Sequence, residues 1–413
     1  MDAIGLTLHH GNTMKVSLFT VAPSGAWIAA TWASVVDQGC DFEWIIGLRA
    51  GVNSGSLPTD PRIKAVQLAD RHGAGDAKRR LIAASTGDVV TDLALGATLA
   101  EGALKKILAT FADPAVGFAA GEVAVDGGGP IPTPVAALTA WALSHVGTIP
   151  RGLPSWRRVF YSALGGHEPS LGDASDYDLM CRTYLKTVCR LVAEPVCIAA
   201  RQVDDALVSS QSDSDLARLC GDGVDASLPS AGQPVTLRDR YLHELVAREA
   251  DLRTLPRYDI GGGIFGAPGW KTLDVSGAPD IQWDVFGQRR LPFEDNSVGA
   301  FRAFDFLEHG EDMDAFWFMD EVHRCLAPGG WFLSYTPHAL GIGASCDPSH
   351  RSRWDERRFL YWCSEGLRPF LLSAYPKATA KFHAGRLFVE RRLMGPAPWR
   401  FDVPYLVADI MKA

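Results

Sequence analysis

Residues 258–275 read YDIGGGIFGAPGWKTLDV, and this stretch decides the fold of the C-terminal half of the chain. One short apolar strand ends in the glycines 261–263, and a second strand ends in Asp274. Because glycine has no Cβ atom, a ligand can approach the backbone closely at such a turn. A carboxylate at the end of the next strand can accept hydrogen bonds from a ribose. Ligands of open parallel sheets bind beyond the carboxyl ends of the strands, so the stretch predicts a nucleotide site.

The pattern of apolar strands followed by acidic turns continues to residue 338. It appears in IQWDVFGQRRLPFEDNSVGAFRAFDFLEH (281–309), and HRCLAPGGWFLSYTPH (323–338) joins a helix-like run to a further strand. Residues 258–392 as a whole resemble the class I S-adenosylmethionine-dependent methyltransferases. The resemblance implies a Rossmann-like α/β sheet with an antiparallel final hairpin. It also implies S-adenosylmethionine as the cofactor and a loop facing the methyl group after the fourth strand.

The resemblance further implies which residues hold the cofactor. Residues 259–263 look like the first cofactor motif, Asp274 like the acid that binds the ribose, and Asp284 like the acid beside the adenine. The predicted cofactor-binding residues are Asp259, Gly261, Gly262, Gly263, Asp274, Asp284 and Asp305. Acids at strand ends also cap loops, and this alternative stays open for each of them.

The crossover from Gly261 to Gly269 departs from the family pattern, because it is too short for the usual helix between two parallel strands. Extended chain, at about 3.3 Å per residue, can still join neighbouring strands. We therefore predict a tight loop without a regular helix. Backbone amides, rather than a helix dipole, would then hold the cofactor.

The composition is that of an ordinary globular protein. The 413 residues suggest two or three domains, and 47% of them are hydrophobic and 21% charged. A net charge of −8 argues against nonspecific nucleic-acid binding. The eight cysteines form no C-x-x-C pair, which favours reduced thiols of a cytoplasmic protein. We find no signal peptide and no apolar run long enough to span a membrane.

The N-terminal half alternates predicted strands with predicted helices, which indicates a parallel α/β domain. Residues 15–201 resemble the family 2 glycosyltransferases of the GT-A fold. The resemblance rests on FEWIIG (42–47), GAGDAKRRLIAASTGD (73–88) and LGGHEPSLGDASDYDLMCR (164–182). It implies a nucleotide-sugar donor, a divalent metal and a catalytic base near Asp176 and Asp178.

The metal-binding acids of that family are largely missing from this chain. Gly47, Leu48 and Arg49 stand where the family carries an acidic turn, and residues 94–96 (ALG) stand at its D-x-D position. Asp92 is the only carboxylate nearby. The sequence therefore predicts either a domain that binds sugar without transferring it or one in which Arg49 replaces a cation.

The composition also predicts the domain boundaries. Residues 1–205 form the glycosyltransferase-like domain, 206–235 a linker rich in Ser, Asp and Gly, and 236–393 the methyltransferase domain. Within the methyltransferase domain, residues 237–252 predict an amphipathic helix, with an apolar stripe of Tyr241, Leu242, Leu245 and Val246. Residues 370–393 predict two strands around a turn. Residues 394–413, which contain three prolines, predict a tail on the surface.

Methyl transfer to a hydroxyl needs a group that removes the proton, and histidines and acids are the usual choice. The candidate catalytic residues are His309, His338, Asp347, His350 and, in the N-terminal domain, Asp176. Each has a plain structural alternative, such as a helix cap or an Asx turn. The spacing does not favour a metal site among them. Trp354 and Trp362 are either stacking surfaces or core, and the arginines 351, 353, 357 and 358 either steer an anionic acceptor or form a solvated helix face.

Three hypotheses follow from the sequence. The first is a methyltransferase acting on a hydroxyl of a small-molecule sugar or a glycan, with an N-terminal domain that transfers or only binds that sugar. The second keeps the methyltransferase but gives it a nucleobase or protein acceptor. The third is a non-enzymatic interaction protein. The ordered cofactor motifs favour the first two.

Overall fold

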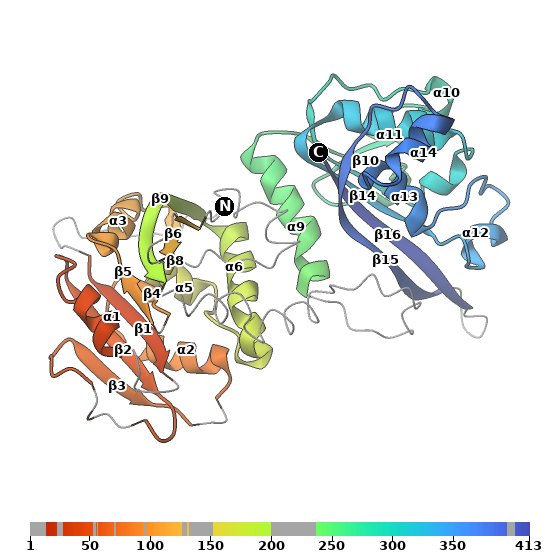
Figure 1. Cartoon of the computed structure of the whole chain (residues 1–413). Coiled ribbons are helices and arrows are strands. Elements are labelled where there is room, and N and C mark those ends of the chain that lie inside the picture. Colours follow the sequence, from red (N-terminus) through yellow and green to blue (C-terminus); the bar gives the residue numbers. More distant parts are fainter. Residues whose placement is uncertain are drawn as a thin grey trace. The chain divides into compact units, whose positions relative to one another are not determined.

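The chain folds into two compact units, Met1–Gly221 and Asp222–Ala413. The structure is a computed structural model (Figure 1). It describes residues 14–22, 28–52, 55, 57–69, 72–94, 96–125, 130–131, 152–199, 237–394 and 401–413. The predicted linker 206–235 lies outside these residues.

The N-terminal unit is built on one mixed sheet with the strand order β3-β2-β1-β4-β8-β6-β9-β5, and β7 pairs with β6. Its strands are β1 (Val16–Ala22), β2 (Phe42–Leu48), β3 (Ile63–Gln67), β4 (Val89–Asp92), β5 (Ala97–Leu99), β6 (Val116–Val125), β7 (Pro130–Ile131), β8 (Gly152–Arg157) and β9 (Val188–Ala199). Strands β1 to β4 are parallel, as the sequence predicts. The prediction of a wholly parallel domain is wrong, because β8 runs antiparallel to both β4 and β6.

The helices of this unit begin mostly at small or polar residues between the strands. They are α1 (Ile28–Val35), α2 (Ala74–Ala83), α3 (Ala103–Thr110), α5 (Arg158–Ala163), the 3-10 helix η3 (Pro169–Ala174) and α6 (Ser175–Lys186). Strands β1 and β2 are buried along almost their whole length. Continuous apolar runs of this kind are typical of a sheet covered on both faces.

The C-terminal unit is a seven-stranded sheet with the order β12-β11-β10-β13-β14-β16-β15. Its strands are β10 (Arg257–Ile260), β11 (Lys271–Asp274), β12 (Ile281–Gln282), β13 (Val298–Phe304), β14 (Leu326–Pro337), β15 (Phe382–Met394) and β16 (Phe401–Lys412). Strands β10 to β14 are parallel, and β16 is antiparallel to both β14 and β15. This topology confirms the predicted α/β sheet with an antiparallel final hairpin.

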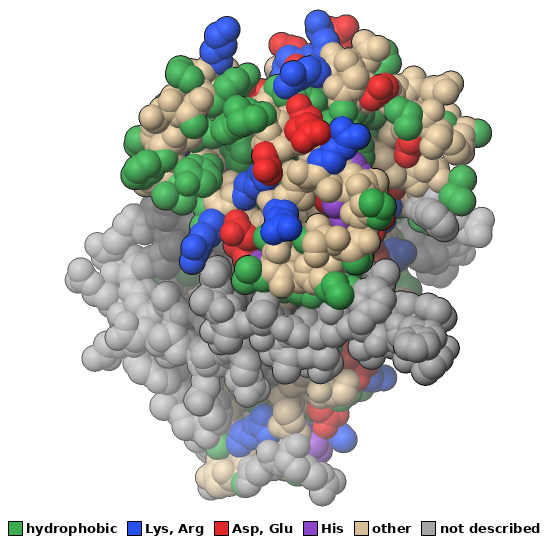
Figure 2. Space-filling model, turned by 90° about the vertical axis from the view of Figure 1, so that its right-hand side faces the viewer, with side chains coloured by type: hydrophobic (Ala, Val, Ile, Leu, Met, Phe, Trp, Pro, Cys, Tyr) green, Lys and Arg blue, Asp and Glu red, His purple; other side chains and the backbone are tan. Residues whose placement is uncertain are grey.

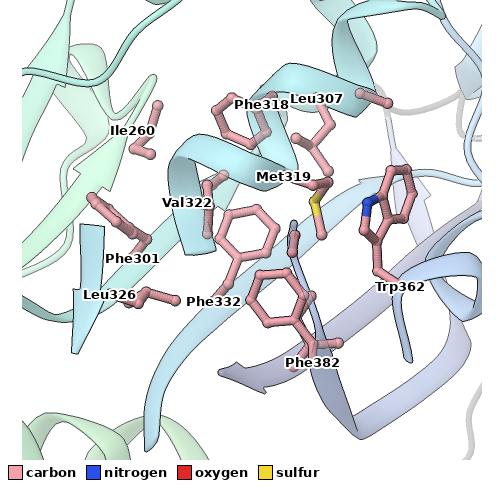
Figure 3. Close-up of a cluster of buried hydrophobic side chains, with 14 of the residues drawn as sticks. Ile260, Phe301, Leu307, Phe318, Met319, Val322, Leu326, Phe332, Trp362 and Phe382 are labelled. Carbon is pink, nitrogen blue, oxygen red and sulfur yellow. The ribbon is translucent and has the colours of Figure 1, made fainter. Parts of the chain in front are cut away.

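Helices and short turns complete this unit. They are α9 (Leu237–Leu252), η4 (Gly263–Phe265), α10 (Val285–Gln288), η5 (Leu307–His309), α11 (Asp314–Cys325), α12 (Gly343–Cys346), α13 (Glu356–Cys363) and α14 (Arg368–Ala374). In Figure 3, Phe318, Met319 and Val322 of α11 point toward Phe332 of β14. Trp362 belongs to the same core, and Trp354 is also buried, so the structural alternative holds for both tryptophans.

Helix α9 packs against β13, and its predicted apolar stripe is confirmed. Tyr241, Leu242, Leu245 and Val246 are all buried. The close approach depends on Gly299 of β13, since a Cβ atom there would lie 2.7 Å from the Cβ of Ala250.

The prediction of a surface tail after residue 393 is wrong. Residues 401–412 form β16, which lies between β14 and β15 inside the sheet. Pro404 is tolerated because it lies just beyond the last β14 pair, Pro337 with Tyr405, while it stands opposite Arg391 of β15. The predicted hairpin within 370–393 is wrong as well. The first half of that stretch contributes to helix α14, and β15 pairs with β16 instead.

No helix among the described residues is both long and apolar enough to cross a membrane.

The position of β16 can be tested by truncating one of its buried side chains. Ile410 is fully buried, so Ile410→Ala should lower the free energy of unfolding of the C-terminal unit by about 2–5 kcal/mol. Calorimetric unfolding would measure the change. The control Phe370→Ala removes an exposed side chain of α14 and should change stability by less than about 0.5 kcal/mol. Equal effects of the two substitutions would contradict a buried β16.

Candidate active site

The glycine loop that follows β10 has the tight form that the sequence predicts. Ile260 pairs with Leu273 of the parallel strand β11, and the amide of Gly261 donates to the carbonyl of Leu273 at 2.8 Å. The crossover contains only the one-turn 3-10 helix η4 and no α-helix, which confirms the prediction for this stretch. Gly261 has a φ of +74°, and a Cβ atom there would lie 2.4 Å from the ring of Phe306. Glycine is therefore required by both conformation and space.

Asp259 fixes this loop to the neighbouring strand. Its side chain is buried, and its Oδ2 accepts from the Arg302 guanidinium of β13 at 2.6 Å and from the Ala267 amide at 3.0 Å. Burial raises the pKa of Asp259, and the charge of Arg302 opposes that rise. The carboxylate thus positions the loop, while its predicted direct contact with the cofactor stays a prediction.

Asp274 and Asp284, the two other strand-end acids, each accept one backbone hydrogen bond through Oδ1. Asp274 accepts from the Ser276 amide through Oδ1 at 3.0 Å, and its Oδ2 would lie 3.5 Å from a Cβ atom on Gly263. The missing side chain of Gly263 therefore leaves space between the loop and the Asp274 carboxylate. Asp284 caps α10 through the Gly287 amide at 2.8 Å, which is the structural alternative for this acid.

The loop after β13 connects the glycine loop to a pocket. It begins at Asp305, which has the positive φ of +48°. Phe306 packs on Gly261 and stacks on Phe286 with ring centroids 4.9 Å apart. Residues 307–309 form η5, so Glu308 and His309 lie just beyond the ring that covers the glycine loop.

The pocket beside η5 has a volume of about 230 Å³. It gathers acids and histidines from the ends of β13 and β14 and from the loop after β14, together with Tyr405 of β16. Its lining residues are Asp305, Glu308, His309, Pro337, Gly343, Cys346, Asp347, His350, Val403 and Tyr405. Four of the sequence-predicted site residues are thus brought together, namely Asp305, His309, Asp347 and His350.

Glu308 is the most perturbed group in this pocket. Only 1% of the residue is exposed. Its Oε2 accepts from the Thr336 hydroxyl at 2.8 Å, and its Oε1 is buried without a hydrogen-bond partner. Burial raises the pKa of Glu308 to about 7. A carboxyl group kept in such surroundings is typical of functional sites.

His309 and His350 lie next to Glu308. Their rings are 5.1 Å apart and nearly perpendicular. His350 Nε2 lies 3.9 Å from Glu308 Oε1, which is too long for a hydrogen bond, and His309 Nδ1 lies 3.2 Å from the Ser349 hydroxyl. The amides of Arg351 and Ser352 donate to the Glu308 carbonyl at 2.7 and 3.1 Å, so the loop that carries His350 is fixed to η5.

Asp347 and His338 have other partners. Asp347 accepts from the Ser349 amide at 2.8 Å, so the Asx turn considered for this loop is present. The hydrogen bonds from the hydroxyl and the amide of Ser349 lower the pKa of Asp347.

His338 is buried but does not line the pocket. Its Nδ1 accepts from the Leu340 amide at 3.2 Å and its Nε2 lies 3.1 Å from Glu356, so the structure does not support its predicted place beside the methyl group.

Glu308 is the residue that sequence reasoning missed. It is absent from the predicted site residues, because the sequence does not show burial. The sequence pattern that could have predicted Glu308 as a site residue is a glutamate next to a histidine shortly after an apolar strand. The partner Thr336 lies 28 positions away and becomes visible only through the pairing of β13 with β14.

The arginines near this loop are partly paired with acids. Arg351 lies 3.1 Å from Glu311, and Arg358 lies 2.7 Å from Asp312. Figure 2 likewise shows basic and acidic side chains interspersed on the face turned to the viewer. These contacts favour a solvated surface over a concentrated anion site.

In the N-terminal unit, the ammonium group of Lys78 lies between the carboxylates of Asp92 and Asp176. Lys78 Nζ of α2 lies 2.6 Å from Asp92 at the end of β4 and 2.5 Å from Asp176 of α6. The buried His167 lies 3.0 Å from the other oxygen of Asp176. Burial alone would raise the pKa of Asp176, but Lys78 and His167 hold it below its usual range.

The two other residues considered for transfer chemistry also have structural partners. Asp178 pairs with Arg182 at 2.5 Å, and Arg49 donates to the carbonyls of Ala69 and His72 at 3.2 and 2.7 Å. Arg49 therefore holds backbone in the structure. Lys78 is the cation that lies between Asp92 and Asp176.

Comparison with known proteins finds a match to part of the C-terminal unit. A family model described as "Methyltransferase domain" matches residues 273–334, which confirms the methyltransferase resemblance of this part of the chain. No curated protein matches the chain.

Some solved glycosyltransferase structures are partly similar. S. aureus TarS has 14% identity and a TM-score of 0.40, with 57% of this chain and 44% of TarS covered. TarS 1–349 with UDP-GlcNAc has 15% identity and a TM-score of 0.42, with 58% and 74% covered. The mannosyltransferase PcManGT from Pyrobaculum calidifontis, in complex with GDP-Man and Mn2+, has 18% identity and a TM-score of 0.42, with 59% and 75% covered. The chain thus spans less than half of the longer TarS structure.

The role of Lys78 can be tested by removing its charge. Lys78→Met leaves two carboxylates facing each other, and it should lower the free energy of unfolding of the N-terminal unit at pH 7 by about 1–3 kcal/mol. The depressed pKa of Asp176 contributes stability above the ordinary aspartate pKa of about 4, and this contribution is lost as the pH falls. The difference between wild type and variant should therefore shrink below about pH 4. Urea unfolding between pH 3 and 8 would measure it.

Lys106→Met is the matched control, since Lys106 forms a more exposed pair with Glu194. It should cost less than about 1 kcal/mol at any pH. A Lys78→Met variant that behaves like this control would show that the ammonium does not hold Asp92 and Asp176 together.

Proposed function

We propose that the chain is an S-adenosylmethionine-dependent methyltransferase that acts on a hydroxyl of a sugar or glycan. In this proposal the N-terminal unit binds the sugar that carries the hydroxyl. The observation that carries the proposal is the pocket beside η5, where the buried Glu308 carboxylate and two histidines converge next to the glycine loop.

The C-terminal unit has the features needed to hold the cofactor. Residues 273–334, which match the methyltransferase family model, begin at the residue before Asp274. Because Gly263 has no side chain, space is left next to the Asp274 carboxylate. When bound, S-adenosylmethionine supplies an electrophilic methyl group on a sulfonium. The residues of this chain must then orient the acceptor in line with the methyl carbon and exclude water.

The pocket residues supply the proton chemistry. As the acceptor oxygen bonds to the methyl carbon, the C–S bond breaks, its electron pair goes to sulfur, and the hydroxyl proton leaves. In this proposal Glu308, His309 and His350 accept that proton, and Glu308 is the member of the three that is buried. A pocket of about 230 Å³ suits the reacting part of a sugar better than a folded protein surface.

The N-terminal unit supports binding more than metal-dependent transfer. A sugar-nucleotide transferase usually neutralises its diphosphate leaving group with a divalent metal held by carboxylates. Asp92 and Asp176 already share the Lys78 ammonium. Thermal-shift screening of nucleotide-sugars, with and without Mn²⁺, should therefore show stabilisation that does not depend on the metal. Stabilisation that requires Mn²⁺ would contradict this part of the proposal.

The cofactor assignment can be tested by calorimetry. Asp274→Ala should weaken S-adenosylmethionine binding at least about tenfold, because the ribose loses a charged hydrogen-bond acceptor. Asp295→Ala is the control, since this exposed acid pairs with an Arg324 that keeps Glu321 as a partner. No binding to the wild-type chain, or unchanged binding to Asp274→Ala, would contradict the assignment.

The acceptor assignment needs a separate experiment. Labelled methyl groups should appear in glycan or nucleotide-sugar fractions, and Glu308→Gln should reduce that transfer by about 10²-fold or more. Binding of S-adenosylmethionine to Glu308→Gln should stay within about twofold of wild type, because Glu308 belongs to the acceptor side. Label in DNA or protein fractions would instead support a nucleobase or protein acceptor.

A further inference from the structure

We propose that Glu308, His309 and His350 bind a divalent transition-metal ion of the Zn²⁺ class. Among the described residues, this trio is the group whose ligand atoms could hold a metal. The spacing of these residues in the sequence does not favour a metal, because His350 lies 41 positions after His309. The structure brings the three side chains to one wall of the pocket.

The first support is the state of the Glu308 carboxylate. The residue is almost fully buried, and only Oε2 has a partner, the Thr336 hydroxyl at 2.8 Å. Oε1 is buried and has no hydrogen-bond partner. A buried carboxylate oxygen without a partner is costly, and a bound cation would remove that cost.

The second support is that two of the three side chains, Glu308 and His309, are already oriented by hydrogen bonds from other groups. Thr336 holds one oxygen of Glu308 and leaves the other for a metal. Ser349 contacts His309 Nδ1 at 3.2 Å and leaves Nε2 for a metal. His350 is mostly buried, and its Nδ1 is buried without a partner. Hydrogen bonds that fix the second atom of a ligand, as at Glu308 and His309, are typical of metal sites.

The distances fit an open site that tightens on binding. One ligand atom from each residue lies within 4.8 Å of the others. Ligand atoms about 2.1 Å from a common metal lie at most about 4.2 Å apart, so closure needs shifts of less than about 1 Å. Asp347 Oδ2, 3.9 Å from His350 Nε2, borders the open side. The pocket leaves a further coordination position for an oxygen of the acceptor.

The ligand types indicate the metal. Two imidazoles and one carboxylate suit Zn²⁺ and other late first-row ions, whereas Mg²⁺ prefers an all-oxygen set. The role of such an ion in methyl transfer rests on the proposed function. With the ion bound, the three side chains act as its ligands and no longer as proton acceptors. A hydroxyl bound to the ion would lose its proton more readily, and Asp347, which lines the same pocket, would accept that proton.

The test is metal binding by the full-length chain after treatment with a chelator. Calorimetry and elemental analysis at pH 7.5 should show one Zn²⁺ per chain, and Mg²⁺ should bind at least about 100-fold more weakly. Glu308→Gln and His350→Ala should each weaken Zn²⁺ binding at least about tenfold. The matched control His383→Ala changes an exposed histidine of β15 and should leave Zn²⁺ binding unchanged.

Several outcomes would overturn the proposal. They are no Zn²⁺ binding to the wild-type chain, equal binding by Glu308→Gln and His350→Ala, or loss of binding in Cys346→Ser, which would assign the metal to a thiol. Calorimetric binding of S-adenosylmethionine confirms that each variant is folded. It also separates the two proposals, because cofactor binding without Zn²⁺ refutes only the metal site, and Zn²⁺ binding without methyl transfer refutes only the function.

Discussion

The C-terminal unit depends on the buried ion pair between Asp259 and Arg302. One carboxylate oxygen contacts the guanidinium at 2.6 Å and the Ala267 amide at 3.0 Å, so β10, the glycine loop and β13 are fixed to one another. The short crossover has no helix that could hold the loop in place. Removing one partner of such a pair leaves an uncompensated buried charge, which is far more costly than exchanging the whole pair for apolar residues.

The rest of the site follows from that fixed loop. With Gly261 held in place, Phe306 can pack on it, and the residues after Phe306 then stand beyond the carboxyl ends of the parallel strands. Glu308 is buried there for a geometric reason, since Thr336 and the amides of the 351–352 backbone close over η5. The raised pKa of Glu308 thus follows from its burial between the carboxyl ends of β13 and β14.

Sequence reasoning found the ordered cofactor motifs, the helix-free crossover and the parallel strands, because each has a local signature. It missed features that depend on pairing between distant segments. Glu308 was not predicted as a site residue, because its burial is decided by residues far along the chain, such as Thr336. His338 looked catalytic because it ends a strand, yet the Leu340 amide and Glu356 hold it elsewhere. In the N-terminal unit the loss of acidic residues was visible, but the Lys78 contacts join elements 98 positions apart.

The place of β16 between β14 and β15 has a consequence for biosynthesis. A ribosome completes β10 to β15 before it makes residues 401–412, so the emerging sheet lacks one of its inner strands until the end. During that interval the long edges of β14 and β15 have no partner in this sheet and are open to wrong pairing. The sheet of the C-terminal unit can therefore be completed only after residues 401–412 have been made, and its unpaired edges are most exposed to wrong pairing before that point.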